Sequence, residues 1–82
     1  MSAFSASDRS RMRWRSRRGL LELDLILTRF LATEFDQLDD AQLGTYVQLL
    51  DLPDNDFLDL VNGKATLADP ALQALVEQLR QV

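Results

Sequence analysis

The residues Arg17-Arg18-Gly19-Leu20-Leu21-Glu22-Leu23-Asp24 divide this 82-residue chain into two parts of opposite charge. Up to Arg18 the chain has six arginines and one aspartate, which gives a net charge of +5. From Gly19 onward it has three basic and twelve acidic residues, a net charge of −9, so the whole chain carries −4. An apolar helical pattern begins at the same point. We therefore take Gly19 as the junction between two helices.

The composition predicts one small all-α domain, residues 1–82, with residues 1–6 loose. Glycine and proline are scarce, leucine is abundant and β-branched residues are few, a composition that favours helices. The absence of His and Cys excludes disulfides and His- or Cys-based nucleophile pairs, argues against a zinc site and fits a reducing compartment. No apolar run approaches the roughly 20 residues of a membrane-spanning helix.

Helical periodicity predicts five helices joined by short turns. We expect them at about residues 8–17, 20–32 and 40–51, with a short fourth helix between residues 54 and 62 and a last one from Pro70. Short connections place successive helices side by side. The predicted fold is a compact five-helix antiparallel bundle.

Capping residues set the expected helix starts. Ser7 is expected to cap the first helix, and Asp54 or Asn55 the fourth. Asp39 with Gln42 three residues later has the spacing of a capping box. Asp69-Pro70 supplies an N-cap and a first helical residue for the last helix.

The three glycines have different expected roles. Gly19 is expected either to end the first helix in a left-handed conformation or to cap the second. Asn62-Gly63 is expected to end the fourth helix in the same left-handed way. Gly44, inside the third helix, costs about 1 kcal/mol relative to Ala and is expected to allow close helix packing.

No catalytic or metal site is expected. The acidic stretch 51–59 invites comparison with a calcium loop, but counting from Asp54 places Asp59 and Ala65 where that loop needs Gly and Glu. These carboxylates are better explained as solvated helix caps. Tyr46 is expected at the edge of the core with its hydroxyl in water. An enzyme is therefore not expected.

The arginine-rich segment has three interpretations, and all three stay open. It can be a solvated helix, a nucleic-acid contact or a docking patch for an acidic protein surface. At helical spacings of three and four, Trp14 lies near Arg11, Arg17 and Arg18. Arginines beside a Trp can bind phosphates and stack a base, but the acidic remainder of the chain repels a polyanion. Arg and Trp also dominate protein–protein interfaces.

The cluster Arg18-Gly19-x-x-Glu22 also has a purely structural interpretation. Gly19 would then only form a turn. Glu22 would stabilise the start of the second helix through the helix dipole, or would pair with Arg18. The residues alone do not decide between this interpretation and a binding site.

The segment Trp14-x-x-Arg17-Arg18-Gly19-x-x-Glu22-Leu23-Asp24 resembles the signature of the succinate dehydrogenase FAD assembly (flavinylation) factors. These are small bacterial proteins. The similarity continues through Leu49-Leu50-Asp51 and Asp54-x-Asp56-Phe57-Leu58. One departure is Leu60, where many members carry Trp, and we interpret it as a core substitution.

The resemblance implies a cytoplasmic assembly factor that is not an enzyme. Such a protein binds the flavoprotein subunit of succinate dehydrogenase, and in bacteria also that of fumarate reductase, and promotes covalent attachment of FAD to a His of that subunit. It implies a monomer with no stably bound cofactor, because FAD is handled on the partner, and no nucleic-acid or membrane partner. The implied partner-binding residues are Arg18, Gly19 and Glu22, then Arg17, Trp14 and Arg11.

Two alternatives to an assembly factor remain. One is a nucleic-acid-binding module that uses the arginine-rich segment, and it predicts binding that weakens steeply with salt. The other is an antitoxin-like regulator, and it predicts a partner unrelated to any flavoprotein.

Overall fold

The computed structural model describes residues 3–82 and contains only helices, turns and loops in this range. The elements are α1 (Ala6–Arg15), α2 (Leu21–Thr33), the 3₁₀ turn η1 (Phe35–Gln37), α3 (Asp40–Leu50), α4 (Asp54–Val61) and α5 (Pro70–Arg80). The prediction of an all-α protein with five helices is confirmed.

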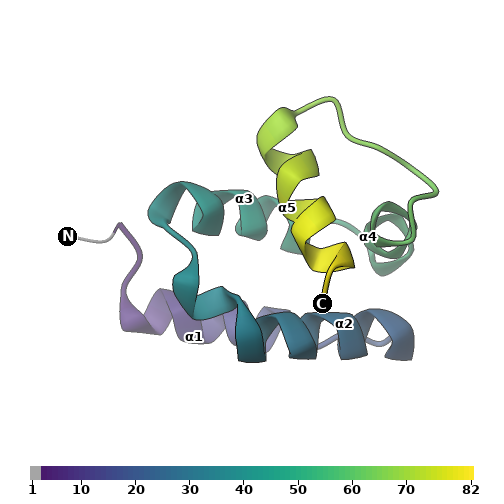
Figure 1. Cartoon of the computed structure of the whole chain (residues 1–82). Coiled ribbons are helices and arrows are strands. Elements are labelled where there is room, and N and C mark those ends of the chain that lie inside the picture. The colour runs from purple at the N-terminus through teal and green to yellow at the C-terminus, as the bar shows by residue number, and fades with distance from the viewer. Residues whose placement is uncertain (1–2) are drawn as a thin grey trace.

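The five helices form two groups. Helices α1 and α2 run along one side of the molecule, and α3, α4 and α5 lie across from them (Figure 1). Helix α5 packs against α2, α3 and α4, whereas α1 packs against α3. Residues 16–20 form the linker between α1 and α2.

The core is built around Tyr46 on α3. Its ring stacks on Phe30 at 5.4 Å between centroids and lies 5.8 Å from Phe35. The prediction that the Tyr46 hydroxyl lies in water is wrong, because the side chain is fully buried and Ser16 supplies its hydrogen bond. Leu60 is buried in the same core, as its interpretation as a core substitution requires.

Helix α1 begins two residues earlier than the predicted cap implied. Ser5, not Ser7, is the N-cap: its Oγ accepts from the Asp8 N–H at 3.1 Å, and the Asp8 carboxylate accepts from the Ser5 N–H at 2.9 Å. The Ser5 N–H bond, then the Ser5 side chain, lowers the pKa of Asp8. This reciprocal box needs a side-chain acceptor three residues after the cap, and Asp8 stands in that position for Ser5, whereas Ser7 has Ser10 there.

The other caps are partly as predicted. The Asp39–Gln42 capping box is present, and the Asp69 carboxylate accepts from the first backbone N–H groups of α5. The prediction that Asp54 or Asn55 caps the fourth helix is wrong, because Pro53 is the N-cap and makes no side-chain capping bond. Asp54 lies instead in the first turn of α4, where its carboxylate binds Arg18.

The start of the chain makes specific contacts with the rest of the fold. The expectation of a loose segment over residues 1–6 falls in part on residues 1 and 2, which lie outside the described residues. In the described part, the Ala3 N–H donates to the Asp40 carboxylate at 2.6 Å, and Phe4 packs against the core. Residues 3–6 are therefore attached to α3 and to the core.

Two of the three expectations for glycine are wrong. Gly63 has φ +76°, as predicted, and it is the one glycine in the described chain with positive φ. Gly19 is thus not left-handed, and Leu20, not Gly19, is the N-cap of α2. A Cβ on Gly44 would meet nothing within 4 Å, so this residue does not mediate close helix packing.

Candidate functional site

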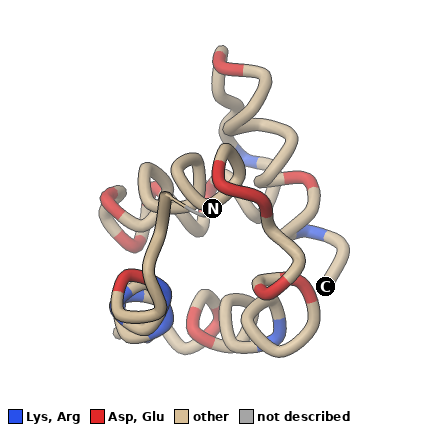
Figure 2. The backbone as a smooth tube through the Cα atoms, turned by 90° about the vertical axis from the view of Figure 1, so that its left-hand side faces the viewer, with Lys and Arg blue, Asp and Glu red and all other residues tan. Residues whose placement is uncertain are grey.

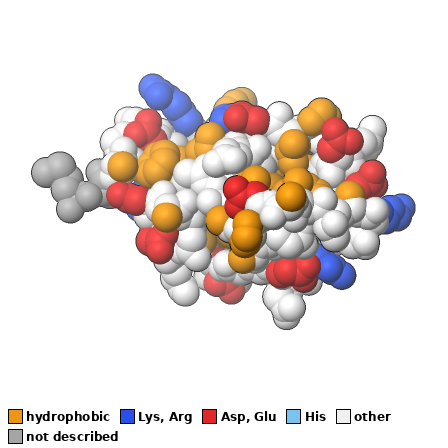
Figure 3. All heavy atoms as spheres, turned by 90° about the horizontal axis from the view of Figure 1, so that it is seen from above, with side chains coloured by type: hydrophobic (Ala, Val, Ile, Leu, Met, Phe, Trp, Pro, Cys, Tyr) orange, Lys and Arg blue, Asp and Glu red, His pale blue; other side chains and the backbone are white. Residues whose placement is uncertain are grey.

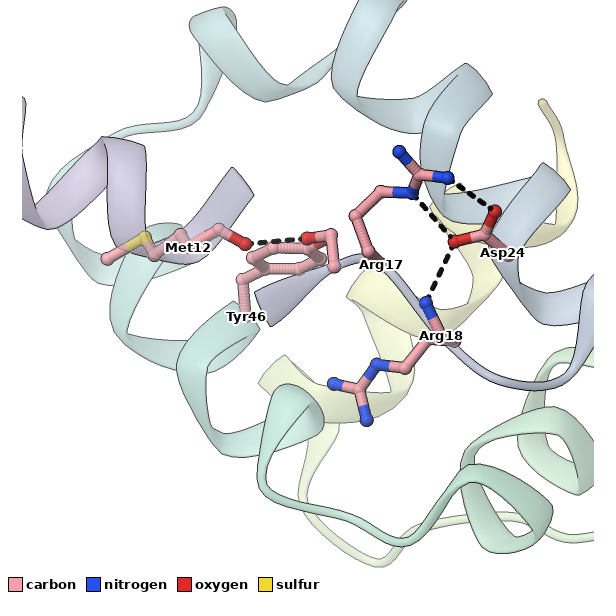
Figure 4. A network of polar contacts seen from close by, with 6 residues as sticks. Met12, Arg17, Arg18, Asp24 and Tyr46 are labelled. Atoms are coloured by element: carbon pink, nitrogen blue, oxygen red, sulfur yellow. Dashed lines mark hydrogen bonds and ion pairs between the residues drawn. The ribbon is translucent and has the colours of Figure 1, made fainter. Parts of the chain in front are cut away.

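The linker between α1 and α2 is held by the carboxylate of Asp24. Asp24 Oδ1 accepts from the backbone N–H of Arg18 at 2.8 Å and from Arg17 Nε at 3.1 Å (Figure 4). The Arg18 N–H bond, followed by the Arg17 side chain, lowers the pKa of the Asp24 carboxyl group. The carboxylate is therefore ionised at neutral pH and fixes the path of the chain before Gly19.

The Arg18 side chain points into the protein. Its guanidinium donates from Nη1 to Asp54 Oδ1 at 3.0 Å and from Nη2 to the Leu50 carbonyl at 2.8 Å. Only 11% of the side chain is exposed, and the guanidinium lies 5.7 Å from the centre of the Phe57 ring. The sequence placed Arg18 first among the partner-binding residues. The structure shows it joining the linker to α3 and α4.

Gly19 and Glu22 lie on the outside of the same segment. A Cβ on Gly19 would meet only Asp54 Oδ2, at an ordinary contact distance of 3.8 Å. Glu22 is exposed and forms no ion pair with any described residue, because Arg18 binds Asp54 instead. Backbone conformation and internal packing do not require glycine at position 19, and Glu22 lies in the first turn of α2, where its charge complements the helix dipole.

Trp14 and Arg11, the other predicted partner-binding residues, lie on α1. Trp14 is 80% exposed, the most exposed large hydrophobic side chain in the described chain. Arg11, one turn earlier, is also exposed and lies 3.7 Å from the Asp8 carboxylate. Because α1 ends at Arg15, the predicted helical spacing to Trp14 holds for Arg11 but not for Arg17 or Arg18. An exposed Trp beside a charged rim is typical of a binding hot spot.

Most of the arginine-rich segment is paired within the chain. Figure 2 shows basic residues gathered on one helix and acidic residues spread over the rest of the fold. Four ion pairs join the two parts: Arg13–Asp36, Arg15–Asp51, Arg17–Asp24 and Arg18–Asp54. The positive charge of the arginine-rich segment is therefore partly balanced by acidic residues of the rest of the fold.

The face of the molecule opposite α1 and α2 has a mixed surface. Seen from above, it mixes hydrophobic and acidic side chains, and the visible basic ones lie at the rim (Figure 3). Surface hollows of about 190, 280 and 210 Å³ lie between α3 and α5, between α1 and α3, and beside α4. Among residues 3–82 no cluster of three His, Cys, Asp or Glu could hold a metal ion, and no helix is long and apolar enough to cross a membrane.

Sequence reasoning missed the partners that shape the site. Asp24 is part of the motif, but no role was predicted for it, and Asp54 was predicted to be a helix cap. Ser16, the fully buried first residue of the linker, was not singled out. The one local signal was opposite charge on the linker and in the first turn of α2, with Arg17 seven residues before Asp24.

These features define a small all-α protein in which an exposed glycine and an exposed glutamate lie at the junction of α1 and α2. Over residues 10–82 the chain matches the family described as the flavinator of succinate dehydrogenase, and it belongs to that family. The resemblance seen in the sequence is confirmed.

Curated relatives from several bacteria agree with this assignment. The chain is similar to proteins named FAD assembly factor SdhE. It is 41% identical to that of Ralstonia nicotianae over 78 residues, which cover 90% of this chain and 82% of the relative. It is 38% identical to that of Methylococcus capsulatus (90% and 89% covered) and 34% identical to that of Photobacterium profundum (96% and 90%).

Proposed function

We propose that this chain binds the flavoprotein subunit of succinate dehydrogenase and promotes covalent attachment of FAD to it. The family and the names of the relatives support this function. The structural observation that carries it is that Gly19 is exposed in the linker without any internal packing that needs a glycine, and that Glu22 is exposed in the first turn of α2 and forms no ion pair with a described residue. A glycine that the fold does not require is explained by a partner that approaches the backbone closely.

The docking surface combines a close backbone approach with oriented charges. Gly19 leaves room for the partner's backbone, and Glu22 can accept charge-assisted hydrogen bonds that set the orientation of docking. Trp14 supplies an apolar anchor. Arg17 and Arg18 hold the linker in shape through Asp24 and Asp54. Because the linker is fixed before binding, little conformational entropy is lost on docking.

The chemistry of flavin attachment belongs to the partner and to FAD. This chain has no His or Cys to which a flavin could be attached, and we propose that it acts without catalysing a step itself. It holds a mobile part of the flavoprotein so that the partner's His and the flavin ring meet in reactive geometry. FAD remains on the flavoprotein throughout.

The proposal extends to the flavoprotein subunit of fumarate reductase as a second partner. It pairs one copy of this chain with one flavoprotein, in the cytoplasm. The lack of cysteine fits that reducing compartment.

The first test is covalent flavin on the flavoprotein subunit, measured by in-gel fluorescence in cells with and without this protein. We expect the signal to fall without it and to return with the native chain, but not with Gly19→Arg, whose long side chain blocks close approach. Gln48→Arg adds the same charge on an exposed position of α3 and should restore the signal. Glu22→Ala should lower the signal and leave the melting temperature nearly unchanged.

Two results would count against this function. If the flavin signal does not change when the protein is absent, the arginine-rich segment should be tested for salt-dependent nucleic-acid binding and the chain for an unrelated protein partner. If purified Gly19→Arg binds the flavoprotein as tightly as the native chain, the docking surface has been placed on the wrong residues.

A further inference from the structure

The outer face of α2 carries an apolar stripe that nothing in the described chain covers. Leu21 is 72% exposed and Leu25 is 48% exposed, and with Trp14 they are the large hydrophobic side chains that face solvent. Thr28 and Ala32 are also exposed. These four residues follow one another at steps of four, three and four, which places them on one face of the helix. The core residues of α2 lie on the opposite face.

Two unpaired charges flank this stripe on the same side. Glu22 directly follows Leu21, and Arg29 directly follows Thr28. They are seven residues apart, which is about 10 Å along a helix. Both are exposed, and neither forms an ion pair with a described residue. The stripe thus has an acid near one end and a base near the other.

This arrangement is complementary to itself. Steps of four and three are the spacing of core positions in a two-stranded coiled coil, and the flanking positions set the orientation of the strands. When two such helices pack antiparallel, Glu22 of one copy lies beside Arg29 of the other. The two-fold symmetry forms this contact twice. In a parallel pair, Glu22 would lie level with Glu22 of the other copy, and Arg29 with the other Arg29. Neither residue would then face a residue of opposite charge.

We propose that the occupant of this face is a second copy of the chain, in a symmetric dimer with antiparallel α2 helices. In that pairing Leu25 of each copy packs against Thr28 of the other, and Leu21 packs against Ala32. The seam involves only a few turns of one helix, less surface than a standard protein–protein interface. The dimer is therefore weak and reversible. The monomer expected from the sequence dominates in dilute solution.

The dimer would regulate access to the candidate docking surface. Glu22 belongs both to that surface and to the proposed seam, so one copy cannot use it for both at once. Self-association would then store the protein in a form that cannot dock. This consequence rests on the proposed function, whereas the dimer itself rests only on α2.

The test is sedimentation equilibrium of the purified full chain over a range of concentrations at low salt, without any flavoprotein. We expect reversible dimerisation of the native chain. Glu22→Arg and Arg29→Glu should each weaken it by about tenfold, because each removes two attractive contacts and adds repulsion. Combining the two substitutions in one chain, or mixing the two single variants in equal amounts, should restore association. Lys64→Glu makes the same charge change as Arg29→Glu in an exposed turn away from α2 and should have no effect.

Three outcomes would overturn the proposal while circular dichroism shows native helicity. They are a monomer at every concentration, association that survives both single charge reversals, and failure of the double variant to restore it. Since no flavoprotein is present, these outcomes leave the assembly function untouched. Loss of flavinylation by Gly19→Arg tests that function separately.

Discussion

The hydroxyl of Tyr46 on α3 lies 2.6 Å from Oγ of Ser16, at the end of α1, and both side chains are fully buried. Ser16 Oγ also donates to the Met12 carbonyl at 2.8 Å (Figure 4). A serine hydroxyl has one hydrogen, so Tyr46 must be the donor in the shared bond. This chain of hydrogen bonds attaches the end of α1 to the core, directly before the linker that carries Gly19.

The two ends of the Tyr46–Ser16 bond should respond unequally to removal. Ser16→Ala leaves the buried Tyr46 hydroxyl without an acceptor and should lower the free energy of unfolding by about 1–3 kcal/mol. Tyr46→Phe removes the hydroxyl while Ser16 keeps its bond to Met12, so the loss should be about 0.5–1.5 kcal/mol. Urea denaturation of both variants measures the difference. A larger loss for Tyr46→Phe would contradict the assignment of donor and acceptor.

Tyr46 should make the fold sensitive to alkali. Burial raises its pKa from 10.0 to about 12. The unfolded chain therefore releases this proton first, and between those values the folded state holds more protons, so stability falls as pH rises. Below pH 10 the contribution is fully present. Since this is the only tyrosine, phenolate absorbance should report its titration directly.

The control for the alkaline effect is Tyr46→Phe. In this variant the urea midpoint should decrease less over the same pH range than it does in the native chain, because no tyrosine hydroxyl titrates. Phenolate formation near pH 10 in the still-folded native chain would show that Tyr46 is accessible to solvent and would refute this account.

Arg18 and Arg17 are neighbours in the sequence but should differ in their effect on stability. Arg18→Ala removes mostly buried bonds to Asp54 and the Leu50 carbonyl and should cost about 1–3 kcal/mol. Arg17 is 69% exposed, and Arg17→Ala should cost at most about 1 kcal/mol. Thermal or chemical unfolding of the two variants gives the comparison. Equal effects would mean that the inward orientation of Arg18 contributes nothing to the fold.

Helices with local start signals could be predicted from the sequence. Asp39 with Gln42, and Asp69 with Pro70, are complete within four residues, and both helices start as predicted. The start of α1 could not be fixed by residue type, because Ser5 and Ser7 are both good caps. The position of Asp8 favours Ser5, and the packing of Phe4 on the core adds a tertiary contact that periodicity does not show.

The motif named Arg18, Gly19 and Glu22 as partner-binding residues, but it did not predict which of them face outward. In the structure Arg18 is largely buried, whereas Gly19 and Glu22 are exposed. Which of them faces outward depends on Asp54, 36 residues after Arg18, because that carboxylate draws the guanidinium inward. Helical spacing carries no information about a contact at that separation. The antiparallel complementarity of Glu22 and Arg29 became visible only once the core face of α2 was known.

Substitution of Gly44 and of Gly63 by alanine should change stability in opposite directions. In α3, a methyl group on Gly44 meets nothing within 4 Å, and Ala in a helix is favoured over Gly by about 0.5–1 kcal/mol, so Gly44→Ala should stabilise the fold. Gly63 has φ +76°, and its added Cβ would lie 3.1 Å from Arg80 Nη2. The left-handed conformation alone should cost Gly63→Ala about 1–2 kcal/mol.

Urea denaturation of the two alanine variants gives the sign of each change. Destabilisation by Gly44→Ala would show that α3 has a neighbour at this position.

The Gly44→Ala variant also separates an effect on stability from an effect on docking. Gly44→Ala is more stable and leaves the linker unchanged, so it should support native levels of covalent flavin in cells. If instead it lowered the flavin signal while raising the melting temperature, the docking surface would have to include α3, and the assignment to Gly19 and Glu22 would be incomplete.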